Sequence, residues 1–463
     1  MNAETRPKDI LGERLAALKP GDVGKALEVF RSNLDHAAAA NLNSCVHCGL
    51  CAETCHYFLA SGEIADHPAY KLNLIASVFK NYFTFAGKAL PGVMGSKPLD
   101  KAMLEEWVDA LYGRCSLCGR CHLNCSIGIH TPSLVRAARA ALAAIGLIPP
   151  ELKSTINRAL ESGNNMGIAQ NEWTETVEWL TDELRTETGD PAADLPLDKN
   201  GARMFYAVNP REPKFFPLSL VAAGKIFHAA GESWTFSSKF YDVTNYAYFS
   251  GVDADAGLIT RRVADEMARL GSTTLVLGEC GHGFASYRWE GPEWLGQRYG
   301  FEVRSILEVI AGYLRDGRIK LDPSKNSKRY TLHDPCNLVR YGGIIEEQRF
   351  ILKHAVKDFV EMIPNRVENF CCGGGGGQMA MSRYAPRRLK AEKVKADQIK
   401  ATGAQVVATP CHNCIDALTE LNKEYKLGVE IKSVCEITAD ALVRANMISM
   451  REPGEFAKTR RSP

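Results

Sequence analysis

Two cysteine motifs in the first third of the chain have the spacing of metal-cluster ligands. Both follow the pattern C-x2-C-x2-C-x3-C, with thiols at Cys45, Cys48, Cys51 and Cys55, and at Cys115, Cys118, Cys121 and Cys125. This spacing is typical of chains that hold a pair of [4Fe–4S] cubane clusters. Three thiolates on one tight loop can bind three corners of a cubane, and the fourth points away along the following helix.

In such pairs the fourth cysteine of each motif ligates the other cluster. We therefore expect two cubanes with exchanged fourth ligands, one held by Cys45, Cys48, Cys51 and Cys125 and the other by Cys115, Cys118, Cys121 and Cys55. Zinc is the alternative, but its sites usually draw on two well-separated pairs of ligands. The proline that commonly follows the fourth cysteine is replaced by His56 and Ser126. Since that proline supplies no ligand, the replacement weakens the prediction little.

A second group of cysteines lies near the C-terminus, in three short segments. These are HDPC, the CCG at the start of a five-glycine run, and CHNC, with thiols at Cys336, Cys371, Cys372, Cys411 and Cys414. Two adjacent cysteines can bind two irons of one cluster that is larger or more open than a cubane. The glycines, Gly373, Gly374 and Gly375 foremost, allow a close backbone approach and can present N–H groups to sulfide. The run matches neither phosphate-binding glycine pattern, and five thiols exceed the need of one tetrahedral zinc.

Four further residues are candidates for the chemistry at this second group. His282, His333 and His412 stand beside cysteines and are candidate proton donors, although for each histidine taken singly a structural or surface role is the favoured reading. Cys280 could contact a substrate across a cleft or be a buried relic, and these two readings stay open. Cys435 lies on an expected apolar helix face and is predicted to be simply buried.

The elements expected after residue 200 are those of a parallel α/β sheet. Short apolar runs predict strands at 204–208, 273–277, 330–332, 406–408 and 430–433, most of them followed by amphipathic helices. The region also resembles itself: residues 260–280 parallel 391–411, and 303–314 parallel 431–442. Such a duplication predicts two pseudo-symmetric lobes with a cleft between them.

The predicted fold class is a multidomain α+β and α/β protein, with a helical two-cluster domain followed by a duplicated α/β domain. Its expected parts are a helical extension (1–40), a two-cluster domain (41–150), a helical linker (151–200), a first lobe lacking most cysteines (201–325), a second, complete lobe (326–450) and a polar tail (451–463).

Composition and charge limit the cellular setting. The chain of 463 residues is 45% hydrophobic and carries 56 basic against 54 acidic residues, so no bulk attraction to nucleic acid is implied. Its N-terminus has no apolar signal segment, and no stretch is long and apolar enough for a membrane span. Fifteen cysteines in a chain without an export signal indicate metal or redox chemistry in the cytoplasm. The insert at 73–95 is read as a packed helix, with a docking face for a membrane subunit as the alternative.

The pattern C-x34-CCG-x37-C-x2-C resembles the cysteine-rich CCG domain of heterodisulfide reductases. With two cluster motifs in front, the chain is similar to the HdrD/DsrK family, and GECGHG and CHNC look most like its DsrK, TmcB and HmcF branch. The resemblance implies a non-cubane [4Fe–4S] cluster on Cys336, Cys371, Cys372, Cys411 and Cys414. It also implies a place on the inner face of the cell membrane, with a b-type cytochrome or other integral membrane subunit, a multihaem cytochrome c complex, and a DsrC-like disulfide protein as partners.

Two functions follow from the resemblance. The first is an oxidoreductase that reduces or forms a disulfide or trisulfide, because two cubanes in series can supply one electron at a time. The second is a pure electron-transfer subunit of a glycolate, lactate or glycerol-3-phosphate type flavin dehydrogenase that feeds quinone. A regulator that binds nucleic acid is not expected, since no such signature is present.

Overall fold

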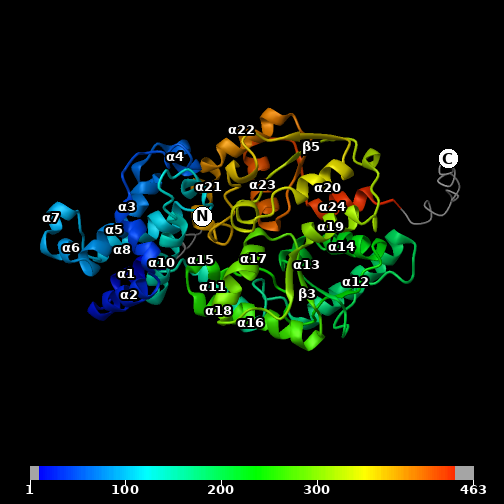
Figure 1. Cartoon of the computed structure of the whole chain (residues 1–463), viewed down its shortest axis with the longest axis horizontal. Helices are drawn as coiled ribbons and strands as arrows, with labels where there is room; N and C mark the ends of the chain where they lie inside the picture. Colours follow the sequence, from blue (N-terminus) through cyan, green and yellow to red (C-terminus); the bar gives the residue numbers. More distant parts are fainter. Residues whose placement is uncertain (1–9, 444–463) are drawn as a thin grey trace, which may run out of the picture.

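The computed structural model describes residues 10–443, and Figure 1 shows their arrangement. The predicted tail at 451–463 and the first nine residues of the predicted N-terminal extension lie outside the described residues. Among those described, no helix combines the length and the apolar character that crossing a lipid bilayer requires.

Residues 10–144 form a helical domain around the two cysteine motifs. Its principal helices are α1 (Ile10–Ala16), α2 (Pro20–Ser32), α3 (His36–Ser44), α4 (His56–Ser61), α5 (Pro68–Phe83), α6 (Phe85–Ala89), α7 (Pro91–Met94), α8 (Lys101–Trp107), α9 (Arg120–Leu123) and α10 (Thr131–Ala144). Helices α5 and α10 each carry a proline in their first turn, where a missing N–H costs nothing. Helix α10 packs against α2 and α5, so its apolar Ala/Leu face lies in the core of this domain.

Two four-stranded parallel sheets follow, and they share one topology. The first has the order β2-β1-β3-β4 and the second β6-β5-β7-β8. Their strands are β1 (Met204–Ala207), β2 (Trp234–Thr235), β3 (Thr274–Leu277), β4 (Glu302–Ser305), β5 (Arg329–Leu332), β6 (Asp358–Glu361), β7 (Val406–Ala408) and β8 (Glu430–Lys432). Adding four to each strand number of the first order gives the second, so the two lobes predicted from the internal repeat are present and the predicted fold class is confirmed.

The three strands that the sequence did not predict, β2, β4 and β6, are all edge strands. Strand β2 has two residues, β4 alternates exposed and buried side chains, and β6 is half-buried throughout. Edge strands are commonly short and polar, so they lack the continuous apolar run by which the buried central strands were predicted.

Helices of the two lobes pack against one another across their interface. Helix α14 (Leu218–Ala229) of the first lobe packs against α24 (Val434–Ala441) of the second, and α20 (Glu347–Ala355) of the second packs against α19 (Ile306–Arg315) of the first. Figure 1 shows these four helices gathered at one end of the molecule. They share a single hydrophobic core that contains residues of both lobes, so neither lobe completes its core alone.

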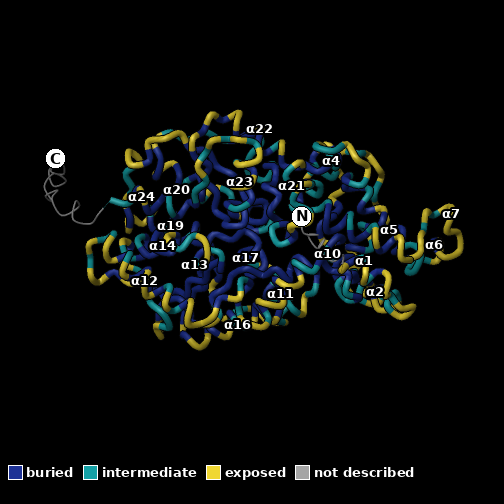
Figure 2. The backbone as a smooth tube through the Cα atoms, turned by 180° about the vertical axis from the view of Figure 1, so that it is seen from behind, coloured by how far each residue is buried: buried dark blue, intermediate teal, exposed yellow. Residues whose placement is uncertain are grey.

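The segment 151–200, expected as a linker, is helical and also contributes to the first lobe. It forms α11 (Pro150–Ser162) and α12 (Gln170–Thr188). Trp173 of α12 is fully buried and stacks on Tyr241 with a centroid distance of 4.1 Å. Figure 2 shows a continuous buried interior through both lobes, whereas α6 and α7 form an exposed projection at the other end.

Candidate metal centre

The two N-terminal cysteine loops have the same backbone geometry. In each, the residue before the second cysteine (His47 or Leu117) and the glycine after it (Gly49 or Gly119) have positive φ, at 55° and 84° in the first loop and 53° and 78° in the second. Non-glycine residues rarely adopt this conformation. Its repetition at matching positions bends both loops so that their cysteines face a common space.

Two cavities lie at these loops, and each brings together four of the predicted ligands. The first is lined by Cys45, Cys48, Cys51 and Cys125, with Cys121 also at its wall. The second is lined by Cys55, Cys115, Cys118 and Cys121. The last cysteine of each motif therefore lies with the first three of the other, which is the exchange expected for paired cubanes.

The first cavity is the more exposed of the two, because it alone contains an exposed cysteine, whereas the four cysteines of the second are partly buried. Cys48 is exposed, and the neighbouring Val46 and Leu50 have exposed fractions of 66% and 44%. In the second loop Ser116 and Leu117 are buried. A redox partner can therefore approach Cys48 directly, while the second loop offers it no exposed cysteine.

The second loop is held by hydrogen bonds to three of its carbonyl oxygens. Arg139 donates to Cys115 O (2.9 Å), the Tyr341 hydroxyl to Leu117 O (3.2 Å), and Arg340 to Cys118 O (2.8 Å). Tyr341 and Arg340 belong to the second lobe, so the C-terminal domain fixes the loop of the N-terminal one.

The five C-terminal thiols form one continuous buried group. The Sγ atoms of Cys336 and Cys371 are 3.6 Å apart, and those of Cys372 and Cys414 are 3.2 Å apart. Cys411 interacts with Cys414, and Cys371 and Cys372 are neighbours in the chain. The group lies where β5 and β7 end, the edge of a parallel sheet at which ligands usually bind.

Proton sharing shifts the pKa values of these thiols in opposite directions. Hydrogen bonding with Cys371 and Cys414 holds the pKa of Cys372 well below its usual range, and hydrogen bonding with Cys414 lowers the pKa of Cys411. The hydrogen bond with Cys371, helped by burial, raises the pKa of Cys336. Part of the group is thus favoured as thiolate, the form that binds metal.

The second cubane site and the five-thiol group are close enough for their thiols to influence one another's pKa. An interaction between the Cys118 and Cys371 thiols is the largest influence on both, and it raises the pKa of Cys118 while lowering that of Cys371. Thiols of the two domains therefore meet at this point, and the predicted sites lie side by side.

The glycine run allows three close approaches. Gly373 (φ 81°) donates its N–H to Cys371 Sγ (3.2 Å), and a Cβ there would lie 1.1 Å from the Glu392 carboxylate. At Gly375 and Gly376 a Cβ would lie within 2.9 Å of backbone atoms of Ser116. The run is therefore also the surface on which the second cysteine loop rests.

The candidate histidines face different ways. A ring nitrogen of His333 and the Sγ atoms of Cys372 and Cys414 all lie within 4.8 Å of one another, and neither of its ring nitrogens has a hydrogen-bond partner among the described residues. His412 instead faces the first lobe, with Nδ1 3.3 Å from Glu279 O and 3.6 Å from a Glu212 carboxylate oxygen.

His282 pairs with Cys280, its Nδ1 lying 3.5 Å from the Cys280 Sγ atom. Burial lowers the pKa of His282 to about 3, so the ring is neutral. Cys280 is buried, and the nearby Cys411 adds to the effect of burial in raising its pKa. The roles of these residues in catalysis stay predictions.

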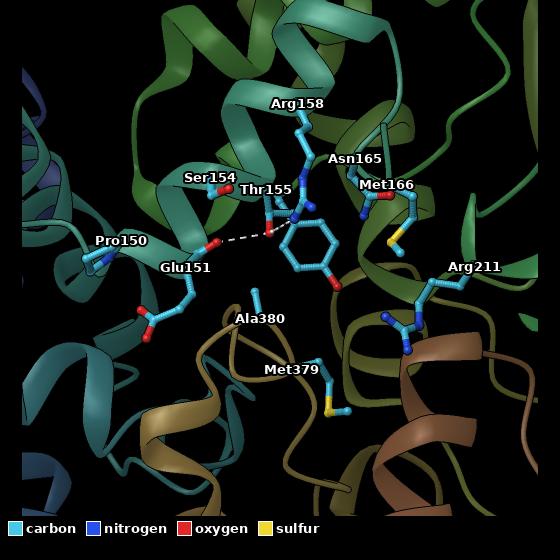
Figure 3. Close-up of a pocket in the computed structure, with 11 residues that line it drawn as sticks. Pro150, Glu151, Ser154, Thr155, Arg158, Asn165, Met166, Arg211, Met379 and Ala380 are labelled. Atoms are coloured by element: carbon cyan, nitrogen blue, oxygen red, sulfur yellow. Dashed lines mark hydrogen bonds between the residues drawn. The ribbon is translucent and has the colours of Figure 1, made fainter. Parts of the chain in front are cut away.

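A larger pocket of about 510 Å³ lies beside the five-thiol group. Figure 3 shows Arg158 projecting from α11 into it, Arg211 on another wall, and Met379 and Ala380 rising from the loop after the glycine run. Tyr246 also lines it and accepts a hydrogen bond on its hydroxyl from Asn413 (3.0 Å), which lies between Cys411 and Cys414. The pocket thus reaches the CHNC segment through one side chain.

The donor set fits iron–sulfur clusters. Each of the two cavities brings together the four cysteines predicted for one cubane, and the second lobe holds five further buried thiols beside the imidazole of His333. These are more sulfur ligands than a single zinc at each site could use.

Comparison with known proteins agrees with this chemistry. Residues 41–129 match the family described as a 4Fe-4S dicluster domain, and residues 330–419 match the cysteine-rich (CCG) domain. The fold and the site therefore define an iron–sulfur protein with an N-terminal dicluster domain and a C-terminal cysteine-rich domain.

Relatives span most of the chain. It is 29% identical to the "Hdr-like menaquinol oxidoreductase iron-sulfur subunit" of Archaeoglobus profundus, over 90% of this chain and 82% of the relative. It is 26% identical to a component of the dihydromethanophenazine:CoB–CoM heterodisulfide reductase of Methanosarcina mazei, over 90% and 98%. It is 23% identical to the "EtfAB:quinone oxidoreductase" of Syntrophomonas wolfei, over 87% and 58%. The chain is thus related to the HdrD-like iron–sulfur proteins, as its cysteine motifs predicted.

Sequence reasoning missed the residues that join the domains. Arg139, Arg340 and Tyr341 bind the second cysteine loop but belong to no cysteine motif. One signal was available for Arg139, which is a charged residue in the middle of an otherwise apolar helix face. A buried arginine in such a place requires several acceptors.

Proposed function

We propose that this chain passes electrons through two [4Fe–4S] cubanes to a non-cubane [4Fe–4S] cluster, at which a disulfide or trisulfide is reduced or formed. The main support is the packing of the second cysteine loop on the C-terminal lobe: Arg340 donates to Cys118 O (2.8 Å), and a Cβ on Gly375 or Gly376 would lie within 2.9 Å of backbone atoms of Ser116. In this proposal the ligands are the two exchanged sets of four cysteines and the five thiols of the second lobe.

The bound clusters would supply one-electron carriers and, in the second lobe, an iron–sulfur surface for exchange with sulfur. The exposed Cys48 in the first cavity and the contact of the second cysteine loop with the C-terminal lobe support this order of the carriers. Electrons from a reduced partner would therefore enter near Cys48. Overall, one disulfide, two electrons and two protons give two thiols.

The pocket beside the five thiols is the proposed place for the sulfur substrate. Its volume of about 510 Å³ suits a small thiol or the end of a peptide. Met379 connects it to the glycine run, since a Cβ on Gly374 would lie 3.2 Å from the Met379 Cγ atom. Tyr246 connects it to Asn413. A ligand in the pocket is thus separated from the glycine run and from the CHNC segment by single side chains.

The charges in the pocket favour a substrate with an acidic group. Arg211 forms an ion pair with Asp416 and Glu151 forms one with Arg383, so these charges are compensated. Arg158 has Thr155 as its hydrogen-bond partner (3.4 Å) and no ion pair among the described residues. Its guanidinium is free to bind a carboxylate or another anionic group.

The partners proposed for the chain follow from its relatives. Their names describe components of menaquinol oxidoreductase and heterodisulfide reductase. We therefore propose an integral membrane subunit, such as a b-type cytochrome, as the electron partner, with the chain on the cytoplasmic face of the membrane. A DsrC-like disulfide protein is the proposed sulfur partner.

The test is the EPR spectrum of the anaerobically purified, oxidised protein with and without mercaptoacetate. An iron content of about twelve atoms per chain is expected for three four-iron clusters. We expect mercaptoacetate to change the signal of the C-terminal cluster alone, and Cys372→Ala to remove that signal. Arg158→Gln should raise the concentration of mercaptoacetate that produces half of the spectral change by about tenfold, because a hydrogen bond to a charged group is lost. The concentration of the cationic thiol cysteamine that produces half of the change should stay nearly the same.

An unchanged spectrum in protein with all clusters intact would favour the second function, a pure electron-transfer subunit. The similarity to a quinone oxidoreductase supports keeping that alternative. A single zinc at the five thiols would exclude both.

A further inference from the structure

A small projection at the end of the N-terminal domain carries exposed apolar side chains. It consists of α6 and α7 and is called the apolar tip here, residues 85–94. Phe85, Leu90 and Val93 have exposed fractions of 88%, 57% and 81%. Figures 1 and 2 show the tip standing away from the rest of the molecule. The sequence reading of 73–95 as a packed helix holds for α5, whose residues are mostly buried, and is wrong for the tip.

The tip is held in this extended position by hydrogen bonds to α5. The Thr84 hydroxyl donates to Lys80 O (2.9 Å) and accepts from the Gly87 N–H (3.1 Å). The Lys97 N–H donates to Ser77 O (3.1 Å), which closes the base of the projection. Gly87 is also packed so closely on Lys80 that a Cβ would lie 2.1 Å from its carbonyl oxygen. The apolar side chains are therefore presented to solvent by an ordered base.

The charges around the tip have one sign. No aspartate or glutamate occurs in the sequence between Asp66 and Asp100, whereas Lys80, Lys88 and Lys97 do. Lys88 and Lys97 are both exposed. In a chain with nearly equal numbers of acidic and basic residues, this stretch is a local exception. It gives the apolar tip a positive border.

We propose that the apolar tip inserts into the interfacial region of a bilayer that contains anionic phospholipid. The apolar side chains of Phe85, Leu90 and Val93 would lie among the upper parts of the acyl chains. The flanking lysine ammonium groups would lie at the level of the lipid phosphates. An exposed apolar patch with a polar rim commonly marks a site of membrane or protein interaction. This inference stands apart from the redox proposal, because no cysteine takes part in it.

Membrane contact here would orient the first cysteine site. The tip continues directly from α5, which packs on α3, and α3 ends at Ser44, immediately before Cys45. The domain that carries the exposed cavity would thus be the part of the chain nearest to the lipid. A redox carrier within the bilayer could then reach it.

The test is flotation of the anaerobically purified holoprotein with protein-free vesicles. One set is phosphatidylcholine alone, and the other has about one third phosphatidylglycerol, a ratio that gives a strongly anionic surface. We expect binding to the anionic set, weakened by high salt. The double variant Phe85→Ser/Val93→Ser should lower the partition coefficient by about tenfold or more. Each of Lys88→Gln and Lys97→Gln should lower it by about fivefold.

Matched controls come from the opposite end of the molecule. Trp179 on α12 is 53% exposed, and Lys199 is exposed. Trp179→Ser and Lys199→Gln should bind as wild type does, and the iron content of every variant should be unchanged.

Three results would overturn the inference. They are no binding of the wild type to anionic vesicles, equal binding of the Phe85→Ser/Val93→Ser protein, and binding only to native membranes that hold an integral partner. The last would assign the tip to a protein surface.

Discussion

Arg139 joins all three parts of the molecule, and its replacement by methionine tests whether this contact holds the cluster sites together. The side chain is fully buried on α10 and donates five hydrogen bonds to four backbone carbonyl oxygens. Leu111 and Cys115 belong to the N-terminal domain, Phe249 to the first lobe and Gly376 to the second. Methionine has a similar length and no donor.

The expected loss of stability follows from these acceptors. A buried carbonyl left without its donor costs about 1–3 kcal/mol, so four of them amount to about 4–12 kcal/mol. Removing the guanidinium also relieves its desolvation, which offsets several kcal/mol. We expect a net decrease of about 4 kcal/mol in the free energy of unfolding, at the upper end for one substitution.

The assay is urea unfolding combined with EPR on the same preparation. A loss of this size should lower the urea midpoint by about 1 M for a chain of this length. The signals of the second cubane and of the C-terminal cluster should broaden, since Arg139 binds Cys115 O and Gly376 O. The signal of the first cubane should not change, because no carbonyl of its loop is bound by Arg139.

Arg262 offers a matched control. It donates to Ala159 O (3.0 Å) and Leu160 O (2.6 Å), is only partly buried and contacts no cysteine loop. Arg262→Met should cost about 1–2 kcal/mol and leave every spectrum unchanged. If Arg139→Met unfolds at the wild-type midpoint with all spectra intact, the four carbonyls do not depend on it and the reasoning is refuted.

Three further predictions concern ligand exchange, the glycine run and pH. Cys55→Ala should remove the EPR signal of the second motif's cubane and Cys125→Ala that of the first; the opposite pairing would show that the fourth ligands are not exchanged. Gly376→Ala should displace the second cysteine loop, with loss of the second cubane and of the C-terminal cluster, because its Cβ would lie 2.7 Å from the backbone of Ser116. The control Gly428→Ala, at a glycine with a similar φ (69°) and open space around it, should lower the free energy of unfolding by only about 1 kcal/mol. Equal effects of the two substitutions on the urea midpoint and the iron content would contradict this prediction. Burial would raise the pKa of Glu232, but hydrogen bonds from Arg203 and Tyr313 outweigh it and lower this pKa to about 2. The contribution of ionised Glu232 to the stability of the fold is therefore complete above the unfolded-state pKa near 4.5 and is lost as the pH falls toward 2. Glu232→Gln should therefore cost about 1–2 kcal/mol at pH 7, with a difference from wild type that narrows below about pH 5 in urea titrations; a difference that does not depend on pH would count against it.

Much of the site could be predicted from the sequence because cluster ligation is written in local spacing. Cys45, Cys48 and Cys51 are brought together by a loop of seven residues, and the same holds for the second motif. The internal repeat likewise predicted two lobes, since each helix–strand–cysteine unit is a local pattern. The central strands were predicted from their apolar runs, whereas three of the four edge strands, β2, β4 and β6, were not.

Contacts between segments far apart in the chain could be decided only by the tertiary structure. Nothing in the spacing places Cys118 against Cys371, Gly376 on Ser116, or Arg139 among carbonyls of three domains. The same is true of the histidines: His333 faces the thiols and His412 faces the first lobe, although both stand beside cysteines. The physical reason is that local patterns fix backbone turns and apolar faces, while the packing of one domain on another fixes which buried groups become partners.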